Sequence, residues 1–365
     1  MTAMMPITTS EENRIPVIRT LVVDDSVVVR TVIERILNAH PAFCVVHKTN
    51  SAEQALAYLS DHDVDLVLLD IELPGQSGIA ALPAILSVRA DAKVAILSAR
   101  CEEGSAVAIE ALALGASEIV SKPGSGSFGD QFPQALIERL ARLFNGERED
   151  VAQSTRQRER SPLSPVAQPA SEPLACLGIG ASTGGIHAIS QLFQGLSAPL
   201  GVPILLTQHL PLSFTMYFAQ QLSRMTDLRV KVAGNGDLLA PDTVYVAPGD
   251  ANLLLRRGLH GRVNIVLNAE RTPTGNLPGV DPMFASMAQV FGPGAAGVVL
   301  TGMGRDGTMG ARDIVASGGW IVAQDEDSSV VWGMPGSVFN AGLCCAVMDP
   351  IGMMEFIGRR GKMLA

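Results

Sequence analysis

The sequence predicts an α/β protein with two doubly wound parallel-sheet domains, one in each half of the chain, joined by a linker. In both halves, short apolar runs alternate with segments whose apolar residues recur every three or four positions. Strands alternating with helices in this way are typical of parallel sheets. A stretch rich in charge, serine and proline separates the two halves. With 365 residues, the chain is long enough for two domains with separate cores.

The composition is that of a globular protein and excludes several classes of function. Hydrophobic residues make up 47% of the chain, and the net charge of −9 argues against nucleic acid as the main partner. No apolar run reaches the roughly 18 residues that cross a bilayer, and the N-terminus lacks a secretion signal. The five cysteines are odd in number and lack C-x-x-C spacing. We therefore expect a cytoplasmic protein that is not inserted in membranes, and we expect a monomer.

The first half of the chain reads as five strands alternating with helices, after a loose leader at residues 1–17. Strand-length apolar runs lie at residues 18–23, 43–46, 64–69, 93–97 and 118–120. Helix-period segments lie at residues 29–37, 52–59 and 133–144. This alternation predicts a parallel sheet covered on both faces.

Polar side chains in this half fall where the predicted strands end. These residues are Asp24, Asp25, Asp70, Ser98 and Lys122. In an open parallel sheet, the carboxyl ends of the strands form the edge where ligands bind. Three carboxylates meeting there repel one another, so Mg²⁺, which binds carboxylate, water and phosphate oxygens, is the expected companion. The lysine and the hydroxyl suit a phosphoryl group.

The motifs of this half resemble the receiver domain of bacterial response regulators, which has a flavodoxin-like fold. The matching stretches are the pair Asp24-Asp25, LLDIELPG around Asp70, ILSA ending at Ala99, and SKP around Lys122. We assign this domain to residues 18–144. The resemblance implies that Asp70 accepts phosphate from a partner histidine kinase.

The same resemblance implies a metal site and a phosphoryl site. The implied Mg²⁺ ligands are Asp25, Asp70 and the Glu72 carbonyl, with Asp24 acting through water. The residues implied to contact the phosphoryl oxygens are Ser98 and Lys122. The chain departs from the family pattern at Gln76-Ser77 and at Ile119, where many receivers carry an aromatic residue. We expect these departures to affect how the signal is relayed, because the phosphorylation chemistry does not depend on those side chains.

Residues 145–173 read as a linker. The segment contains Pro162, Pro165, Pro169 and Pro173 and few large apolar residues, so it has nothing from which to build a core. We expect a semi-extended tether whose first residues continue the preceding helix.

The second half, residues 174–365, again predicts a doubly wound, Rossmann-like sheet. Apolar runs suited to parallel strands lie at residues 174–179, 202–206, 243–246, 297–300 and 320–323. Helical segments lie at residues 186–193, 214–222 and 282–291, and residues 252–255 and 262–267 suit a hairpin. The pattern is therefore α/β throughout.

A serine stands at the first strand-to-helix turn of this half. The sequence from Gly180 to Gly184 fits G-x-S-x-G, the turn that lifts the Oγ of a nucleophilic serine, here Ser182, above the edge of a parallel sheet. Two other readings remain open from this stretch alone. Gly178 and Gly180 could open a dinucleotide-binding loop, although the third glycine comes one place too late. The serine could also be a plain helix N-cap.

A histidine and an aspartate follow two other strands of this half. Because Ser182, His209 and Asp306 lie within a few residues of separate strand ends, a parallel sheet brings them to one rim. A nucleophile, a general base and an orienting carboxylate require that placement. Spacing does not choose the acid, and the four candidates are Asp250, Asp306, Asp325 and Asp327.

Five long motifs of this half resemble the catalytic domain of the chemotaxis protein-glutamate methylesterases. They are GIGASTGG, TQHLPLSFTMYFAQQL, VYVAPGD, LTGMGRDG and AQDEDSSVVWGMP. The resemblance implies a catalytic triad of Ser182, His209 and Asp306. The residues implied beside it are Thr183, as backbone oxyanion donor, and Met303, lining the site. The stretch AGLCCAVMDP departs from the family, and we expect it to affect surface contacts.

The resemblance implies a phosphorylation-regulated hydrolase. Its substrates would be glutamate methyl esters on cytoplasmic helices of methyl-accepting chemoreceptors, with methanol as product, and receptor glutamines would be deamidated by the same chemistry. No cofactor is expected for catalysis itself. Two alternatives stay open: a response regulator with a non-catalytic second domain, and a receiver fused to a hydrolase of small esters.

Overall fold

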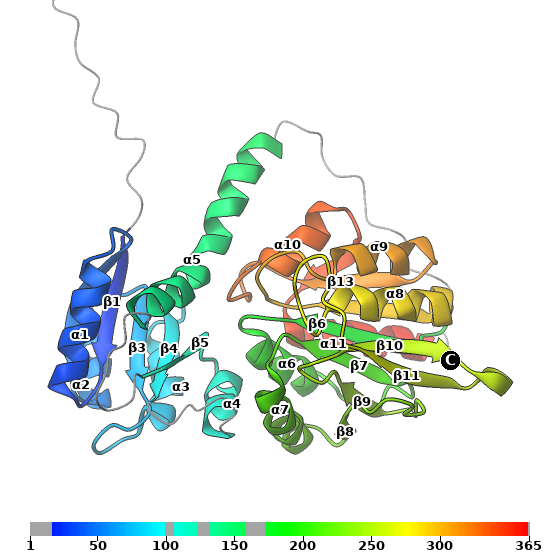
Figure 1. Cartoon of the computed structure of the whole chain (residues 1–365), viewed down its shortest axis with the longest axis horizontal. Helices are drawn as coiled ribbons and strands as arrows, with labels where there is room; N and C mark the ends of the chain where they lie inside the picture. The colour runs from blue at the N-terminus through cyan, green and yellow to red at the C-terminus, as the bar shows by residue number, and fades with distance from the viewer. Residues whose placement is uncertain (1–16, 99–105, 123–131, 158–171, 364–365) are drawn as a thin grey trace, which may run out of the picture. The chain divides into compact units, whose positions relative to one another are not determined.

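The computed structural model describes residues 17–98, 106–122, 132–157 and 172–363. Within these ranges the chain forms two parallel sheets flanked by helices, and a two-stranded antiparallel ribbon (Figure 1). The predicted α/β class with two parallel sheets is confirmed. The predicted leader and the later part of the linker fall almost wholly outside the described residues. None of the helices in these ranges is long and apolar enough to span a membrane.

The first sheet has five strands in the order β2-β1-β3-β4-β5. Its strands are β1 (Ile18–Val23), β2 (Phe43–Thr49), β3 (Leu66–Asp70), β4 (Lys93–Ser98) and β5 (Glu118–Ser121). The helices of this half are α1 (Val27–Asn38), α2 (Ala52–Asp61), α3 (Gly78–Val88), α4 (Ala106–Ala113) and α5 (Phe132–Gln157). All five residues of β3 are buried, as expected of a strand covered on both faces.

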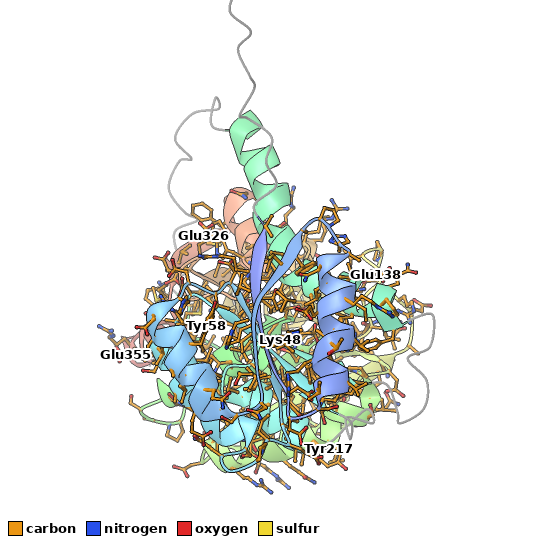
Figure 2. The ribbon with its side chains drawn as sticks, turned by 90° about the vertical axis from the view of Figure 1, so that its left-hand side faces the viewer. Lys48, Tyr58, Glu138, Tyr217, Glu326 and Glu355 are labelled. Atoms are coloured by element: carbon orange, nitrogen blue, oxygen red, sulfur yellow. The ribbon has the colours of Figure 1, made fainter. Side chains whose placement is uncertain are left out.

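Side chains tie α1 and α2 to the edge strand β2. Figure 2 looks onto this edge, with α1 and α2 on opposite sides of the strands. Tyr58 of α2 stacks on His47 of β2 with ring centroids 4.2 Å apart, and on His62 at 4.1 Å. On the other side, Lys48 of β2 pairs with Glu34 of α1. The contacts hold a helix against each face beside an otherwise exposed strand.

The last helix of this half continues into the predicted tether, as the sequence predicts. The helix-period segment ends at residue 144, and α5 extends to Gln157. Residues 147–157 contain mostly good helix formers, and the first proline of the linker is Pro162. The first part of the predicted tether is therefore helical.

The domain boundaries remain a prediction. Contacts divide the chain into two compact units, Met1–Ala92 and Lys93–Ala365, so that this division precedes β4. Strand pairing instead keeps β4 and β5 in the five-stranded sheet. Because a sheet is a hydrogen-bonded unit, β4 and β5 belong with the first sheet.

The second sheet has seven parallel strands in the order β14-β13-β12-β6-β7-β9-β8. These strands are β6 (Cys176–Ala181), β7 (Ile204–Gln208), β8 (Arg229–Val232), β9 (Thr243–Val246), β12 (Ala295–Val299), β13 (Trp320–Gln324) and β14 (Cys344–Met348). The strand order reverses at β6, which lies between β7 and β12. Such a switch point opens a crevice at the carboxyl ends of the strands.

Six α-helices and a hairpin complete the described part of this half. The helices are α6 (Gly185–Gln194), α7 (Leu212–Met225), α8 (Val280–Phe291), α9 (Thr308–Ala316), α10 (Gly333–Asn340) and α11 (Pro350–Met363). The ribbon pairs β10 (Asn252–Arg257) with β11 (Val263–Asn268), which confirms the predicted hairpin. The edge strands β8 and β14 and the helices α9, α10 and α11 were not predicted. β8 has only four residues, two of them charged, and both edge strands are largely half-buried.

Candidate active site

The serine turn predicted from the sequence is present. Ser182 directly follows β6, and α6 begins at Gly185. The backbone N–H of Gly185 donates to Ser182 O at 2.8 Å, which closes the turn. Gly184 has a φ of +75°, a left-handed conformation that residues with a Cβ rarely adopt. The strand, tight turn and helix therefore leave Ser182 at the switch point of the sheet.

The glycines before the serine serve helix packing. Gly178 and Gly180 lie inside β6 and not in a loop, which is why the dinucleotide-loop reading is wrong. A Cβ on Gly178 would lie 2.5 Å from the Met287 sulfur, and one on Gly180 would lie 2.4 Å from Val280. Both neighbours belong to α8. The two glycines thus allow α8 to pack closely on the strand that ends at Ser182.

A hydrogen bond joins His209 to Asp306. His209 follows β7, and Asp306 lies between β12 and α9, so the two come from the strands on either side of β6. His209 Nε2 lies 2.8 Å from Asp306 Oδ2. The Asp306 side chain is fully buried, and the His209 side chain keeps 15% of its surface exposed. With Nε2 bonded to the carboxylate, Nδ1 is the ring nitrogen left to accept a proton.

Asp306 is held by backbone donors as well as by the histidine. Oδ2 also accepts the N–H of Val280 at 2.8 Å, and Oδ1 accepts those of Asp281 at 3.1 Å and Gly307 at 3.0 Å. Val280 and Asp281 are the first residues of α8, so the carboxylate lies at the positive end of that helix. Burial alone would raise the pKa of Asp306, but the bonds from His209 and from these N–H groups hold the pKa below its ordinary value.

The other three candidate acids lie elsewhere. Asp250 and Asp327 are exposed. Asp325 caps its own loop, with Oδ1 accepting from Ser328 N at 2.9 Å and from the Ser328 hydroxyl at 2.6 Å. Among the described residues, Asp306 is the acid bonded to His209.

Two backbone N–H groups are candidate donors for an oxyanion site. Within the described part of the chain, the N–H groups of Thr183 and Met303 have no hydrogen-bond partner. In the same part of the chain, no hydrogen bond joins Ser182 Oγ to His209. Catalytic hydrogen bonds are often long before substrate binds, so the lack of this bond does not exclude Ser182 and His209 as a catalytic pair.

Sequence reasoning missed a second carboxylate beside Asp306. Asp281 Oδ1 accepts the N–H of Gly310 in the first turn of α9 at 2.8 Å. Asp306 thus caps α8 while Asp281, from α8, caps α9. Burial, opposed by the bond from Gly310 and assisted by the charge of Asp306, raises the pKa of Asp281 to about 6. In the sequence, Asp281 looks like an ordinary first-turn acid, so only the helix pairing reveals it.

A cleft opens beside this pair. It has a volume of about 1280 Å³, and its lining includes Asp281, Met303 and Arg305. Residues of the segment after β11 and of α10 also line it. The cleft shows that solvent-accessible space reaches the loop that carries Asp306.

The predicted acidic cluster forms at the edge of the first sheet. Asp24, Asp25 and Asp70 each offer a carboxylate oxygen, and these oxygens lie within 4.8 Å of one another. Asp24 and Asp70 are buried and Asp25 is exposed. Hard oxygen ligands at this spacing fit Mg²⁺, so the cluster can hold such an ion.

The remaining predicted residues lie at neighbouring strand ends. The N–H of Glu72 donates to Asp70 Oδ1 at 3.2 Å, which places its backbone beside the cluster. Ser98 is the buried last residue of β4, the strand next to β3. The N–H of Lys122 donates to Ser98 O at 2.8 Å. Ala99 and Pro123, which complete the two motifs, fall outside the described residues.

Comparisons with known proteins agree with both halves. Residues 177–357 match the family model described as CheB methylesterase, and residues 20–127 match the response regulator receiver domain. The protein-glutamate methylesterase/protein-glutamine glutaminase 2 of Caulobacter vibrioides is 39% identical over 95% of this chain and 100% of its own length. A protein with the same activities in its name, from Nitrobacter hamburgensis, is 37% identical and covers 91% of each chain.

A solved structure resembles the second half. The CheB methylesterase catalytic domain of Thermotoga maritima is 33% identical, covers 51% of this chain and 98% of its own, and has a TM-score of 0.49. The relatives align over nearly the whole chain, and the receiver match precedes the methylesterase match in the order that the sequence predicts. The chain therefore belongs to the protein-glutamate methylesterase/protein-glutamine glutaminase family, hydrolases that carry a response-regulator receiver domain.

Proposed function

We propose that this chain is a phosphorylation-regulated serine hydrolase acting on chemoreceptors in the cytoplasm. It removes methyl groups from glutamate side chains and deamidates glutamine side chains. Family membership supports the activity. One arrangement in this chain supports the mechanism: Ser182 on a strand-to-helix turn, beside a histidine whose far nitrogen is held by a buried carboxylate.

Each group has a distinct task in the proposed reaction. Ser182 Oγ attacks the carbonyl carbon of the glutamyl methyl ester, and its proton passes to Nδ1 of His209. Asp306 stabilises the resulting imidazolium. The negative oxygen of the tetrahedral intermediate accepts hydrogen bonds from the backbone N–H groups of Thr183 and Met303, for which the described residues provide no other partner.

The intermediate then collapses in two stages. The bond to the methoxy oxygen breaks, His209 returns the proton, and methanol leaves. Water, deprotonated by the same ring, attacks the acyl-serine and releases glutamate and Ser182. Glutamine follows the same path with ammonia as the leaving group. No step requires a cofactor.

The receiver supplies the regulation in this proposal. Asp70 accepts a phosphoryl group from the histidine kinase of the pathway, and phosphorylation raises hydrolase activity. Asp25, Asp70 and the Glu72 carbonyl would hold Mg²⁺, with Asp24 acting through water, and the ion would offset the negative charge that gathers around the transferred group. Ser98 and Lys122 contact the phosphoryl oxygens. We keep residues 18–144 as the receiver, 145–173 as the linker, 174–365 as the catalytic domain, and a monomer as the working unit.

The test is methanol release from radiomethyl-labelled chemoreceptor membranes. Ser182→Ala should lower the rate by about 10⁴-fold, as removal of the nucleophile does in serine hydrolases. Ser223→Ala, an exposed serine on α7, serves as the control and should keep the normal rate. Near-normal turnover by a folded Ser182→Ala protein would rule out the serine mechanism. Hydrolysis of small esters without action on receptors would favour the small-ester hydrolase.

A further inference from the structure

Two buried side chains hold the backbone on both sides of the nucleophile. Thr301, two residues after β12, is 1% exposed, and Gln208, the last residue of β7, is 5% exposed. The N–H of Ser182 donates to Thr301 O at 3.0 Å. Gln208 Nε2 donates to Ser182 O at 2.8 Å, and the Thr301 hydroxyl lies 3.0 Å from Thr183 O. The strands on either side of β6 thus each send a residue to the serine turn.

These bonds leave one polar backbone group of the dipeptide open. The N–H and C=O of Ser182 and the C=O of Thr183 are all bonded, whereas the N–H of Thr183 has no partner within the described part of the chain. An unpaired N–H beside the nucleophile is what an oxyanion donor requires. Its direction follows from the bonded groups, because each peptide unit is planar.

Thr301 is itself fixed from the side away from the serine. Its N–H donates to Gln324 Oε1 at 2.7 Å, and its hydroxyl accepts the N–H of Val331 at 3.0 Å. The hydroxyl can give its one proton to Thr183 O or to Val331 O, which lies at 3.1 Å. Because Thr301 is hydrogen-bonded on one side to Gln324 and Val331 and on the other to the serine turn, it restricts the movement of Ser182 relative to the sheet.

The glycine that begins α6 makes room for Gln208. A Cβ on Gly185 would lie 2.2 Å from Gln208 Oε1, so any larger residue there would displace the amide. Within the described residues Oε1 has no partner, so the amide is held through its donor to Ser182 O. Gly185 therefore makes room for the bond from Gln208 to Ser182 O, while Gly184 provides the left-handed turn.

We propose that Thr301 and Gln208 are positioning residues that form a clamp on Ser182 and Thr183, keeping the hydroxyl and the open N–H aligned for one substrate carbonyl. The inference rests on the proposed function, since it assigns a task to groups around the nucleophile. Neither side chain is placed to touch substrate, because both are buried beneath the turn. Loss of either should therefore lower kcat and leave KM nearly unchanged.

The decisive variant is Thr301→Val in the full-length chain, which keeps the shape and removes the hydroxyl. We expect kcat for receptor demethylation to fall by about 10- to 100-fold with KM within about twofold of wild type. Thr301→Ser restores the hydroxyl and should return kcat to within about threefold. The matched control is Thr207→Val, a fully buried threonine of β7 whose hydroxyl, among the described residues, donates to the Met283 sulfur at 3.2 Å. Its kcat should stay near wild type.

Gln208→Met provides a second route if Thr301→Val does not fold. It removes the donor to Ser182 O and should give the same loss of kcat at unchanged KM. If the folded variants match Thr207→Val, or if Thr301→Ser is as impaired as Thr301→Val, the clamp is wrong. Ser182→Ala in the same assay separates the two ideas. If Ser182→Ala retains turnover, the proposed function fails; if it is inactive while Thr301→Val is normal, only the clamp fails.

Discussion

Both sheets place carboxylates at the carboxyl ends of parallel strands, but the two sites balance that charge differently. In the second sheet, Asp306 is fully buried and receives hydrogen bonds from His209 and from three backbone N–H groups. In the first sheet, three carboxylates lie with their oxygens within 4.8 Å of one another. A buried charge satisfied by the protein is a permanent part of the site, whereas clustered like charges call for a cation. The second site is therefore built into the fold, whereas the first can also take a cation.

The largest effect expected from this difference is that of Asp306→Asn. The neutral amide of the variant cannot stabilise the imidazolium of His209. Its NH₂ group would also face backbone N–H donors that in the wild type bond to a carboxylate oxygen of Asp306. We expect demethylation to fall by about 10³- to 10⁴-fold, measured as methanol release. The effect should be the same with and without Mg²⁺.

The control for that variant is Asp325→Asn, which changes another acid of the same sheet edge. Asp325 bonds Ser328 in its own loop, so its loss should change turnover by less than about threefold. A severe Asp325→Asn variant beside a mild Asp306→Asn variant would show that the acid is misassigned.

Removal of Mg²⁺ should separate the two sites. In excess chelator, a small phosphodonor should no longer phosphorylate the chain, and the stimulation of demethylation should be lost, whereas basal turnover should stay within about twofold. Asp70→Asn should give the same pattern with Mg²⁺ present. Phosphate labelling and methanol release, measured on the same samples, check both parts. Undiminished labelling of Asp70→Asn would reject that site, and loss of basal turnover in chelator would reject metal-free catalysis.

The sequence reveals the rim residues because strand ends are readable in it. Ser182 and His209 follow apolar runs directly, so the parallel-sheet rule brings them to one edge. The choice of Asp306 over Asp325 depends on the N-terminus of α8, which meets the aspartate loop only through tertiary packing. No local pattern encodes that meeting.

The supporting residues escape sequence reasoning for the same reason. Thr301 stands at the end of an apolar strand and looks like its last residue. Its five hydrogen-bond contacts within the described residues nevertheless reach Ser182, Thr183, Gln324 and Val331. Its partners lie between 23 and 119 positions away in the sequence. Residue type and spacing therefore locate the reactive groups, whereas the groups that hold them require the fold.

The smallest effect expected concerns Asp281, whose carboxyl contrasts with that of Asp306. The pKa of Asp306 is lowered, so its contribution to stability is present at neutral pH and lost as the pH falls. The pKa of Asp281 is raised to about 6, so its contribution is present below its unfolded value and lost as the pH rises through about 6.

Asp281→Asn removes only the titration of Asp281 and keeps an oxygen that accepts the N–H of Gly310. The stability advantage of the variant over wild type should be larger at about pH 7.5 than at about pH 5 by about 1 kcal/mol, after discounting for solvent screening. Urea unfolding at both pH values measures this, with the exposed Asp313→Asn of α9 as the control. An equal stability difference at both pH values would show that Asp281 does not titrate in this range and that its carboxyl acts only as a cap.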